Sequence, residues 1–169
     1  FALNMTGFGA GVFMYVGLLA LTMARHFLGA PVEGKMTPTL WVHLAPLSVI
    51  PLSMLALLKT TGDASLLRYG SLVAAAFLGA ALWWLVLAVS MTIRNRRQGK
   101  LPFALSWWAF VFPIGACSVL AYRVSELLAL EVLPLVASGL TLLALFVWSA
   151  TALGTVRGIR TGAIFAPAH

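Results

Sequence analysis

The sequence of 169 residues is poor in charge, and above all in negative charge. It contains only four aspartate and glutamate residues, and charged residues of both signs make up 9% of the chain. A soluble domain carries about 25% charged residues. Because 62% of the residues are hydrophobic, this scarcity excludes a soluble globular protein and predicts an integral membrane protein.

Cysteine and the common catalytic motifs are also scarce. Cys117 is the single cysteine and lies in an apolar run, so the chain has no disulfide framework. The sequence has no nucleotide-binding loop, catalytic triad or metal-ligand cluster, and we expect neither enzyme activity nor a bound cofactor or metal. The net charge of +7 comes from basic residues between the hydrophobic runs. This pattern is typical of membrane orientation and argues against nucleic-acid binding.

Five hydrophobic runs are each long enough to cross a bilayer as a helix. We expect helices at about residues 7–24, 38–58, 65–93, 102–122 and 127–155, followed by a basic tail over 157–169. The runs are continuous rather than alternating, which favours an all-α membrane fold over a β-barrel. We interpret residues 1–169 as a single transmembrane domain.

Lysine and arginine are divided unevenly between the two sides of the membrane that these helices define. Eight of them fall on the side of the C-terminus, and three, Lys59, Arg68 and Arg123, fall on the other side. Basic loops remain in the cytoplasm, so we expect a cytoplasmic C-terminus, an external N-terminus and a bacterial inner membrane. The chain opens on Phe1 beside a hydrophobic segment without a signal peptide. We therefore expect it to be the C-terminal half of a longer protein.

Prolines divide the predicted helices into two kinds. Pro46 and Pro51 lie within 38–58 and Pro113 lies at the middle of 102–122, whereas the other long helices have no central proline. A proline removes one helical hydrogen bond and its ring clashes with the carbonyl four residues back. In a membrane the freed groups must be buried in protein or line a wet cavity. We expect the two broken helices to line a pore and the straight ones to face lipid.

Short polar connections, at 60–65 and 122–126, join each broken helix to the straight helix that follows it. The sequence thus predicts a hairpin of one broken and one straight helix, repeated twice, with an inner and an outer layer. In the second connection we expect a local ion pair between Arg123 and Glu126. A role for this pair in attracting anions to a pore mouth is the alternative.

Phe112 lies directly before the central proline of its helix. Helical spacing places Leu105, Ala109 and Ala116 on the face of Phe112, so small residues would leave space on both sides of one large ring. We expect Phe112 to gate a pore that is lined by these residues and by Pro113. The simpler alternative is that Phe112 packs between helices, as most intramembrane phenylalanines do.

His43 shares a helical face with Pro46 and Ile50. We expect all three to line the pore, with His43 as a pH-sensitive group; a capped histidine near the interface is the alternative. His26 is expected near the same membrane face, so a haem between His26 and His43 is a more distant hypothesis. No predicted helix carries a central charged residue, which indicates weak, distributed selectivity and favours a channel over a tightly coupled pump.

Three segments resemble one transporter family. Residues 103–113, Phe-Ala-Leu-Ser-Trp-Trp-Ala-Phe-Val-Phe-Pro, resemble the Phe-Ser-Xaa-Ala-Trp-Trp-Ala-Tyr-Thr-Phe-Pro stretch typical of the tellurite-resistance/dicarboxylate transporter family. That family includes the slow anion channels of plant guard cells, yeast malate permeases and sulfite efflux pumps. Residues 39–46 are similar to its corresponding broken helix, although Leu47 replaces the usual second proline, and 155–165 are similar to its closing segment.

The resemblance implies ten helices in five hairpins around a central pore, with bent inner helices and straight outer ones. This chain would supply the last five helices, and Phe112 would stand where family members have a phenylalanine that plugs the pore. The implied function is passive flux of small inorganic or organic anions. The resemblance also implies an N-terminal half that completes the protein, and assembly as a homotrimer. A proton-coupled carrier for dicarboxylate, sulfite or a tellurite-related anion is the alternative.

Overall fold

The computed structural model describes residues 2–29 and 37–162, and within these ranges it contains helices and turns but no strand. In chain order the elements are α1 (Ala2–Leu28), α2 (Thr37–Trp41), α3 (Leu44–Lys59), α4 (Ala64–Arg97), the 3-10 helix η2 (Leu105–Trp107), α5 (Trp108–Leu128) and α6 (Leu133–Thr161). Among the described residues, five spans are long and apolar enough to cross a membrane, with α2 and α3 forming one span and η2 and α5 another. The expected all-α fold with five membrane helices is confirmed.

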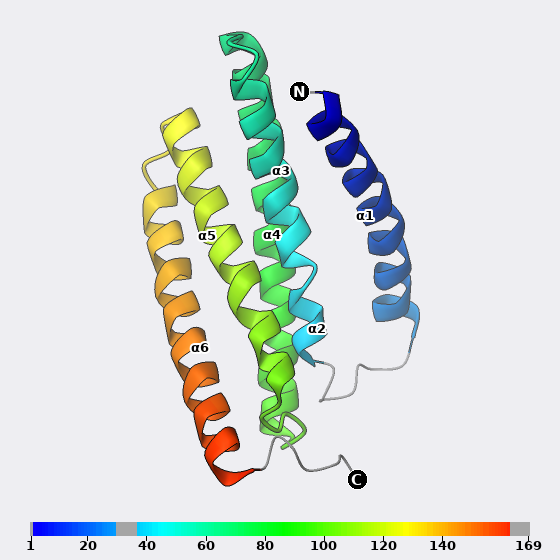
Figure 1. The fold of residues 1–169 in the computed structure, drawn as a ribbon, viewed down its shortest axis with the longest axis vertical. Coiled ribbons are helices and arrows are strands. Elements are labelled where there is room, and N and C mark those ends of the chain that lie inside the picture. The colour runs from blue at the N-terminus through cyan, green and yellow to red at the C-terminus, as the bar shows by residue number, and fades with distance from the viewer. Residues whose placement is uncertain (1, 30–36, 163–169) are drawn as a thin grey trace.

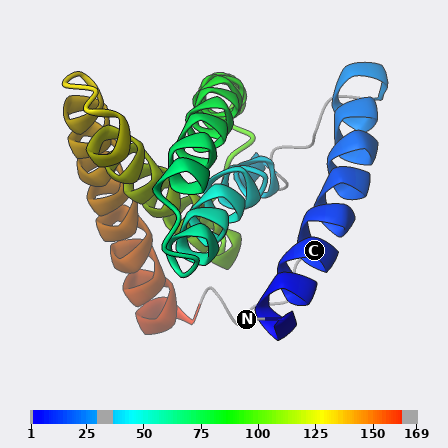
Figure 2. The ribbon, with the colours of Figure 1, turned by 90° about the horizontal axis from the view of Figure 1, so that it is seen from above.

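The five spans lie side by side and alternate in direction (Figure 1). The central group consists of α3, α4 and α5, and α6 packs along α5. Viewed from above, α1 stands at one edge of the molecule and α6 at the other (Figure 2). Tyr15 is the only buried residue of α1. This helix contacts the other described helices mainly through α3. The described helices therefore form an open arrangement around α3, α4 and α5.

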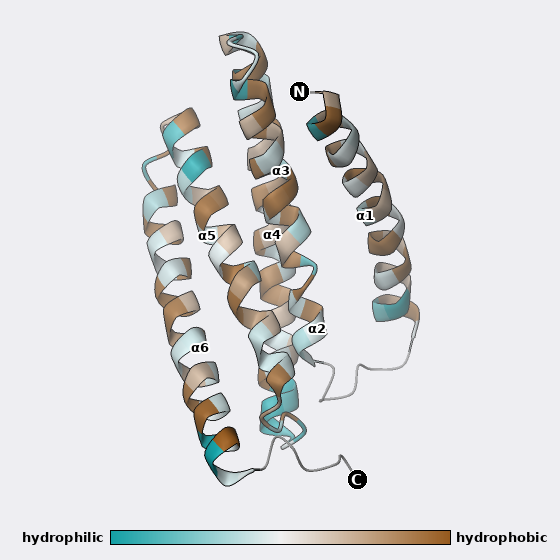
Figure 3. Cartoon of the chain, in the orientation of Figure 1, coloured by the Kyte–Doolittle hydropathy of each residue, from teal (hydrophilic) through white to brown (hydrophobic). Residues whose placement is uncertain are grey.

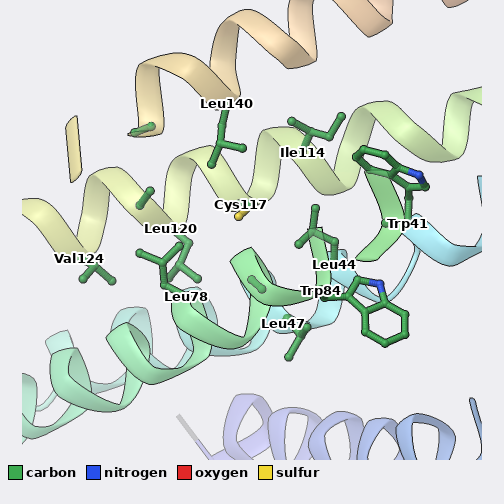
Figure 4. Packing of buried hydrophobic residues seen from close by; sticks show 14 of the residues in the cluster. Trp41, Leu44, Leu47, Leu78, Trp84, Ile114, Cys117, Leu120, Val124 and Leu140 are labelled. Atoms are coloured by element: carbon green, nitrogen blue, oxygen red, sulfur yellow. The ribbon is translucent and has the colours of Figure 1, made fainter. Parts of the chain in front are cut away.

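The core lies where α3, α4 and α5 meet (Figure 4). Leu44, Ile114 and Cys117 are fully buried there. The buried face of α4 carries three alanines seven residues apart, Ala74, Ala81 and Ala88, each at most 2% exposed. Small side chains at helical spacing let membrane helices pack closely without a hydrophobic driving force between them.

The first broken helix is interrupted at Val42 and His43, where a turn separates α2 from α3. The sequence predicted a break near Pro46 and Pro51. The observed interruption lies just before Pro46, at the residue whose carbonyl is four positions back from this proline, and none lies at Pro51. Pro46 lies in the first turn of α3, a position where its missing N–H has no helical partner to lose. Pro51 lies inside α3, which continues to Lys59.

Two ring side chains from other helices bind the carbonyls beside this interruption. The indole Nε1 of Trp84, on α4, donates to the carbonyl oxygen of Leu40 at 2.7 Å. The hydroxyl of Tyr15, on α1, donates to the carbonyl oxygen of His43 at a longer 3.4 Å. Unsatisfied backbone groups are costly in a membrane, so these contacts explain how the chain tolerates a break away from water.

No interruption appears at Pro113, the second expected break, and a bend of the helix there stays a prediction. The helix α5 continues through Pro113 from Trp108 to Leu128, and its irregular part lies earlier, in the 3-10 turn η2. The predicted start at residue 102 is too early because Ala104 has an extended backbone (φ −147°, ψ 160°). A proline beyond the first turn removes one helical hydrogen bond and crowds the carbonyl four residues back, here that of Ala109, but α5 continues past it.

The connection predicted at 122–126 lies within α5, and the observed connection spans residues 129–132. The helix ends at Ala129, whose φ of 51° is left-handed. Arg123 and Glu126 are neighbours on the helical surface, and Arg123 Nη1 contacts Glu126 Oε2 at 2.9 Å, which confirms the expected ion pair. Polar residues thus mark the end of the apolar span but not the end of the helix.

The remaining helices differ from the predicted bounds at their ends. Helix α1 is longer at both ends than 7–24, α4 is longer than 65–93, and α6 is shifted by six residues from 127–155. The predicted tail over 157–169 is helical as far as Thr161. Residues 163–169 lie outside the described part. Apolar composition fixed the spans, but charged residues at the membrane surface extend the helices beyond them.

Asp63 begins α4 as its N-cap. Its carboxylate accepts hydrogen bonds from the Ser65 hydroxyl and from the backbone N–H groups of Ser65 (2.8 Å) and Leu66 (3.2 Å). The Ser65 hydroxyl, followed by these two N–H groups, holds the pKa of Asp63 below its ordinary value. A lowered pKa contributes stability that is present above the unfolded-state pKa and is lost as the pH falls through the folded-state pKa.

Replacing Asp63 with alanine should therefore lower the thermal midpoint of the full-length protein at pH 6, and the difference from wild type should shrink as the pH approaches 3. Thermal unfolding in detergent at a series of pH values measures it. The matched control is Glu131→Ala, an exposed acid at the same end of the bundle. A difference that is constant with pH would contradict the capping account.

Replacing a buried alanine of α4 with a larger side chain should destabilise the bundle. Ala81→Leu places three carbons in a fully buried position, and overpacking of this kind costs about 1–3 kcal/mol. Ala80→Leu, at the neighbouring exposed position, should have little effect. Equal thermal midpoints for the two variants would show that α4 does not pack through Ala81.

Candidate pore-lining surface

Helix α5 buries one face and leaves the opposite face uncovered in the described chain. Ile114, Cys117 and Ala121 are fully buried against the neighbouring helices. Phe112, two residues before Ile114, is 65% exposed although it is large and apolar. The contrast singles out the Phe112 face as a surface that the described helices do not use for packing.

Phe112 lines an apolar groove of about 810 Å³ between α3, α5 and α6. Gly115 and Ala116 adjoin the ring on α5, and Val49 and Leu52 face it from α3. The other lining residues are Val111, Ser118, Val119, Tyr122, Thr141, Ala144, Leu145 and Trp148. No charged side chain lines this groove. We call it the Phe112 groove.

Of the residues expected to share a surface with Phe112, some lie in the Phe112 groove and others lie outside it. Ala116 lines the Phe112 groove. Leu105 is exposed and lines a separate groove farther along α6. Ala109 is half-buried, and Pro113 is buried on the packed side of α5. Their roles in a pore remain predictions.

His43 lies on another side of the bundle. Its half-buried ring is 5.2 Å from the ring of Trp84 and 6.3 Å from that of Tyr15, between centroids. Pro46 and Ile50 are half-buried, and neither lines the Phe112 groove. The pore-lining role of these three residues stays a prediction.

Val49 and Leu52 were missed by the sequence reasoning. The predicted face ran from His43 through Pro46 to Ile50. His43 caps α3 with helical backbone angles (φ −65°, ψ −23°), so these three residues do follow one helix. Val49 and Leu52 lie on another face of the same helix, and the packing of α3 against α5 brings that face into the groove.

The two histidines of the haem hypothesis pack on one indole. The ring of His26, on α1, lies 5.8 Å from that of Trp84, at an angle of 74°. Its Nδ1 is 2.7 Å from the carbonyl oxygen of Thr22, so Nδ1 carries a proton and donates it to this carbonyl. Ring packing and this hydrogen bond account for the position of His26, and the pair needs no haem to explain it.

The charged side chains of the described residues lie near the two ends of the bundle, where the hydropathy colouring includes strongly hydrophilic positions (Figure 3). One end, called the basic end, carries Arg25, Arg94, Arg96, Arg97, Lys100, Arg157 and Arg160. The described part of this end has no aspartate or glutamate. The opposite end carries Lys59, Asp63, Arg68, Arg123, Glu126 and Glu131. The asymmetry supports the predicted orientation, with the basic end in the cytoplasm.

Comparison with known proteins identifies the family. Residues 1–156 match the model of the SLAC1 family, described as voltage-dependent anion channel. The chain belongs to this family. The family resemblance of the Trp-Trp-Ala segment is thereby confirmed, and SLAC1 members and the relatives below are channels and transporters rather than enzymes. No solved structure matches the chain.

Two relatives come from Methanocaldococcus jannaschii. The uncharacterized transporter MJ0576 is 31% identical over 163 residues, which cover 96% of this chain and 47% of the relative. The uncharacterized transporter MJ0762 is 31% identical over 163 residues, which cover 96% of this chain and 48% of the relative. The chain thus spans about half the length of these relatives.

Proposed function

We propose that the full-length protein is an anion channel of the cell membrane, with a pore lined in part by α3 and α5 and gated by Phe112. The observation that carries the proposal is the 65% exposure of Phe112 beside Gly115 and Ala116, in a groove without charged residues. A large ring among small neighbours on an unpacked face can block a passage and can also rotate aside. Membership of an anion-channel family supports the choice of ion.

The proposed flux is passive. A membrane potential supplies about 2.3 kcal/mol per elementary charge per 100 mV, which drives anions without ATP. A buried charge in the pathway would create a fixed ion site, and the Phe112 groove has none. Selectivity would then be weak and would come from the width of the passage and from backbone and hydroxyl dipoles.

The proposed assembly has ten helices in five hairpins, of which α1 would be the outer helix of the third. The pairs α3–α4 and α5–α6 pack as antiparallel hairpins, and α4 and α6 are uninterrupted, as outer helices should be. The roughly twofold length of the relatives supports an additional N-terminal half. A homotrimer is proposed from the family resemblance alone.

Removing the Phe112 ring should open the passage. In the full-length protein reconstituted in planar bilayers, Phe112→Ala should raise anion conductance about tenfold or more, because it removes the steric block while leaving the packed face of α5 intact. Phe146→Ala is the matched control, since Phe146 is 70% exposed on α6 but does not line the Phe112 groove. Unchanged conductance in well-expressed Phe112→Ala would falsify the gate.

A proton-coupled anion carrier is the second candidate, and the position of His43 favours it. This titratable side chain lies at the break between α2 and α3, where a small backbone movement would change its surroundings. In proteoliposomes, such a carrier would move protons in step with dicarboxylate or sulfite, and His43→Gln would uncouple them. Anion flux without proton movement would exclude this mechanism and leave the channel.

A further inference from the structure

A second groove, of about 620 Å³, opens at the basic end between the start of α5 and the last turns of α6. It is separate from the Phe112 groove and shares no lining residue with it. Its lining residues are Phe103, Ala104, Leu105, Gly154, Arg157, Gly158 and Thr161. The proposed anion pathway does not account for this groove.

Specific contacts fix the walls of this groove. The Phe103 ring lies directly on Gly154, and a Cβ at that position would come within 2.4 Å of the ring. The Trp108 indole Nε1 donates to the Thr155 hydroxyl at 3.2 Å. The Trp107 indole Nε1 donates to the Pro102 carbonyl oxygen at 3.1 Å. The segment before α5 is therefore anchored against α6, and the groove is a built feature of their junction.

The groove combines an apolar floor with a positive rim. Phe103 and Leu105 are 37% and 50% exposed, although both are apolar. Arg157 is exposed at the rim and has no ion-pair partner among the described residues. All described acidic side chains lie at the opposite end of the bundle. An anion at Arg157 would meet no repulsion from a described carboxylate.

The position of the groove selects the kind of anion. It lies at the start of one candidate membrane span and at the end of the next, and the ends of a span are the parts that meet the lipid headgroups. There an acyl chain can cover the floor while a phosphate reaches the rim. Arginine binds phosphate through charge-assisted hydrogen bonds, and basic pockets between membrane helices are suited to anionic headgroups. A soluble phosphate would leave the apolar floor uncovered.

We propose that this groove binds one anionic phospholipid, with its phosphate on Arg157 and an acyl chain against Phe103 and Leu105. The inference rests on membrane insertion and not on the proposed gate. Bound lipid would bridge the start of α5 and the end of α6 and would stabilise their junction.

The test uses the purified full-length protein in detergent with added phosphatidylglycerol or phosphatidylcholine. Phosphatidylglycerol should raise the thermal midpoint more than phosphatidylcholine does, and native mass spectrometry should show its preferential retention. Arg157→Gln should weaken phosphatidylglycerol binding about tenfold, as expected for the loss of one charge-assisted contact. Arg157→Lys keeps the charge and should retain part of the binding, which guards against an effect of misfolding.

Arg25→Gln is the matched control, since Arg25 lies at the same end but on α1, outside the groove. It should bind phosphatidylglycerol as the wild type does. If Arg157→Gln and Arg25→Gln weaken phosphatidylglycerol binding equally, the lipid responds to general surface charge, and the proposal is overturned. Equal stabilisation by inorganic phosphate would overturn it in favour of a soluble ligand. No preference for phosphatidylglycerol would also overturn it and would indicate that another part of the protein covers the groove.

Discussion

Satisfying the backbone inside a membrane is the constraint on which this structure depends. The chain is interrupted at residues 42 and 43 within a membrane span, where water cannot bind the freed carbonyls. Trp84 of α4 supplies a donor to the Leu40 carbonyl, and Tyr15 of α1 adds a donor to the His43 carbonyl, which also accepts from the Leu47 N–H at 3.5 Å. The Trp84 ring also packs with both histidines, and the Tyr15 ring packs with His43. These contacts at the break thus join α1, α3 and α4 at one place in the bundle.

Within this bundle, one face of α5 packs against other helices and the face with Phe112 is exposed. The face with Ile114 and Cys117 is fully buried and joins α3, α4 and α5 into one core. The face with Phe112 is free to serve a passage, because the core does not need it for stability. The proposed gate can therefore change its side-chain position without disturbing the packing that holds the helix in place.

The sequence was sufficient for the membrane class, the five spans, the family and the Arg123–Glu126 pair, because each depends on composition or on local spacing. It was insufficient where a contact from a distant helix decides the local structure. The prolines alone did not show that the interruption lies at residues 42 and 43, beside the Leu40 carbonyl that Trp84 binds, or that the helix continues through Pro113. The packing of α3 against α5, which the sequence does not reveal, brings Val49 and Leu52 into the groove with Phe112.

The central claim is that the Phe112 face meets water rather than lipid. Cysteine accessibility tests it most directly, in the full-length protein with Cys117 replaced by serine. Ala116→Cys, in the Phe112 groove, should react with a charged, membrane-impermeant thiol reagent, whereas Phe146→Cys on α6 should not. Labelling at residue 116 by an apolar reagent alone, with no reaction by the charged one, would place this face against lipid or packed protein and would contradict the account.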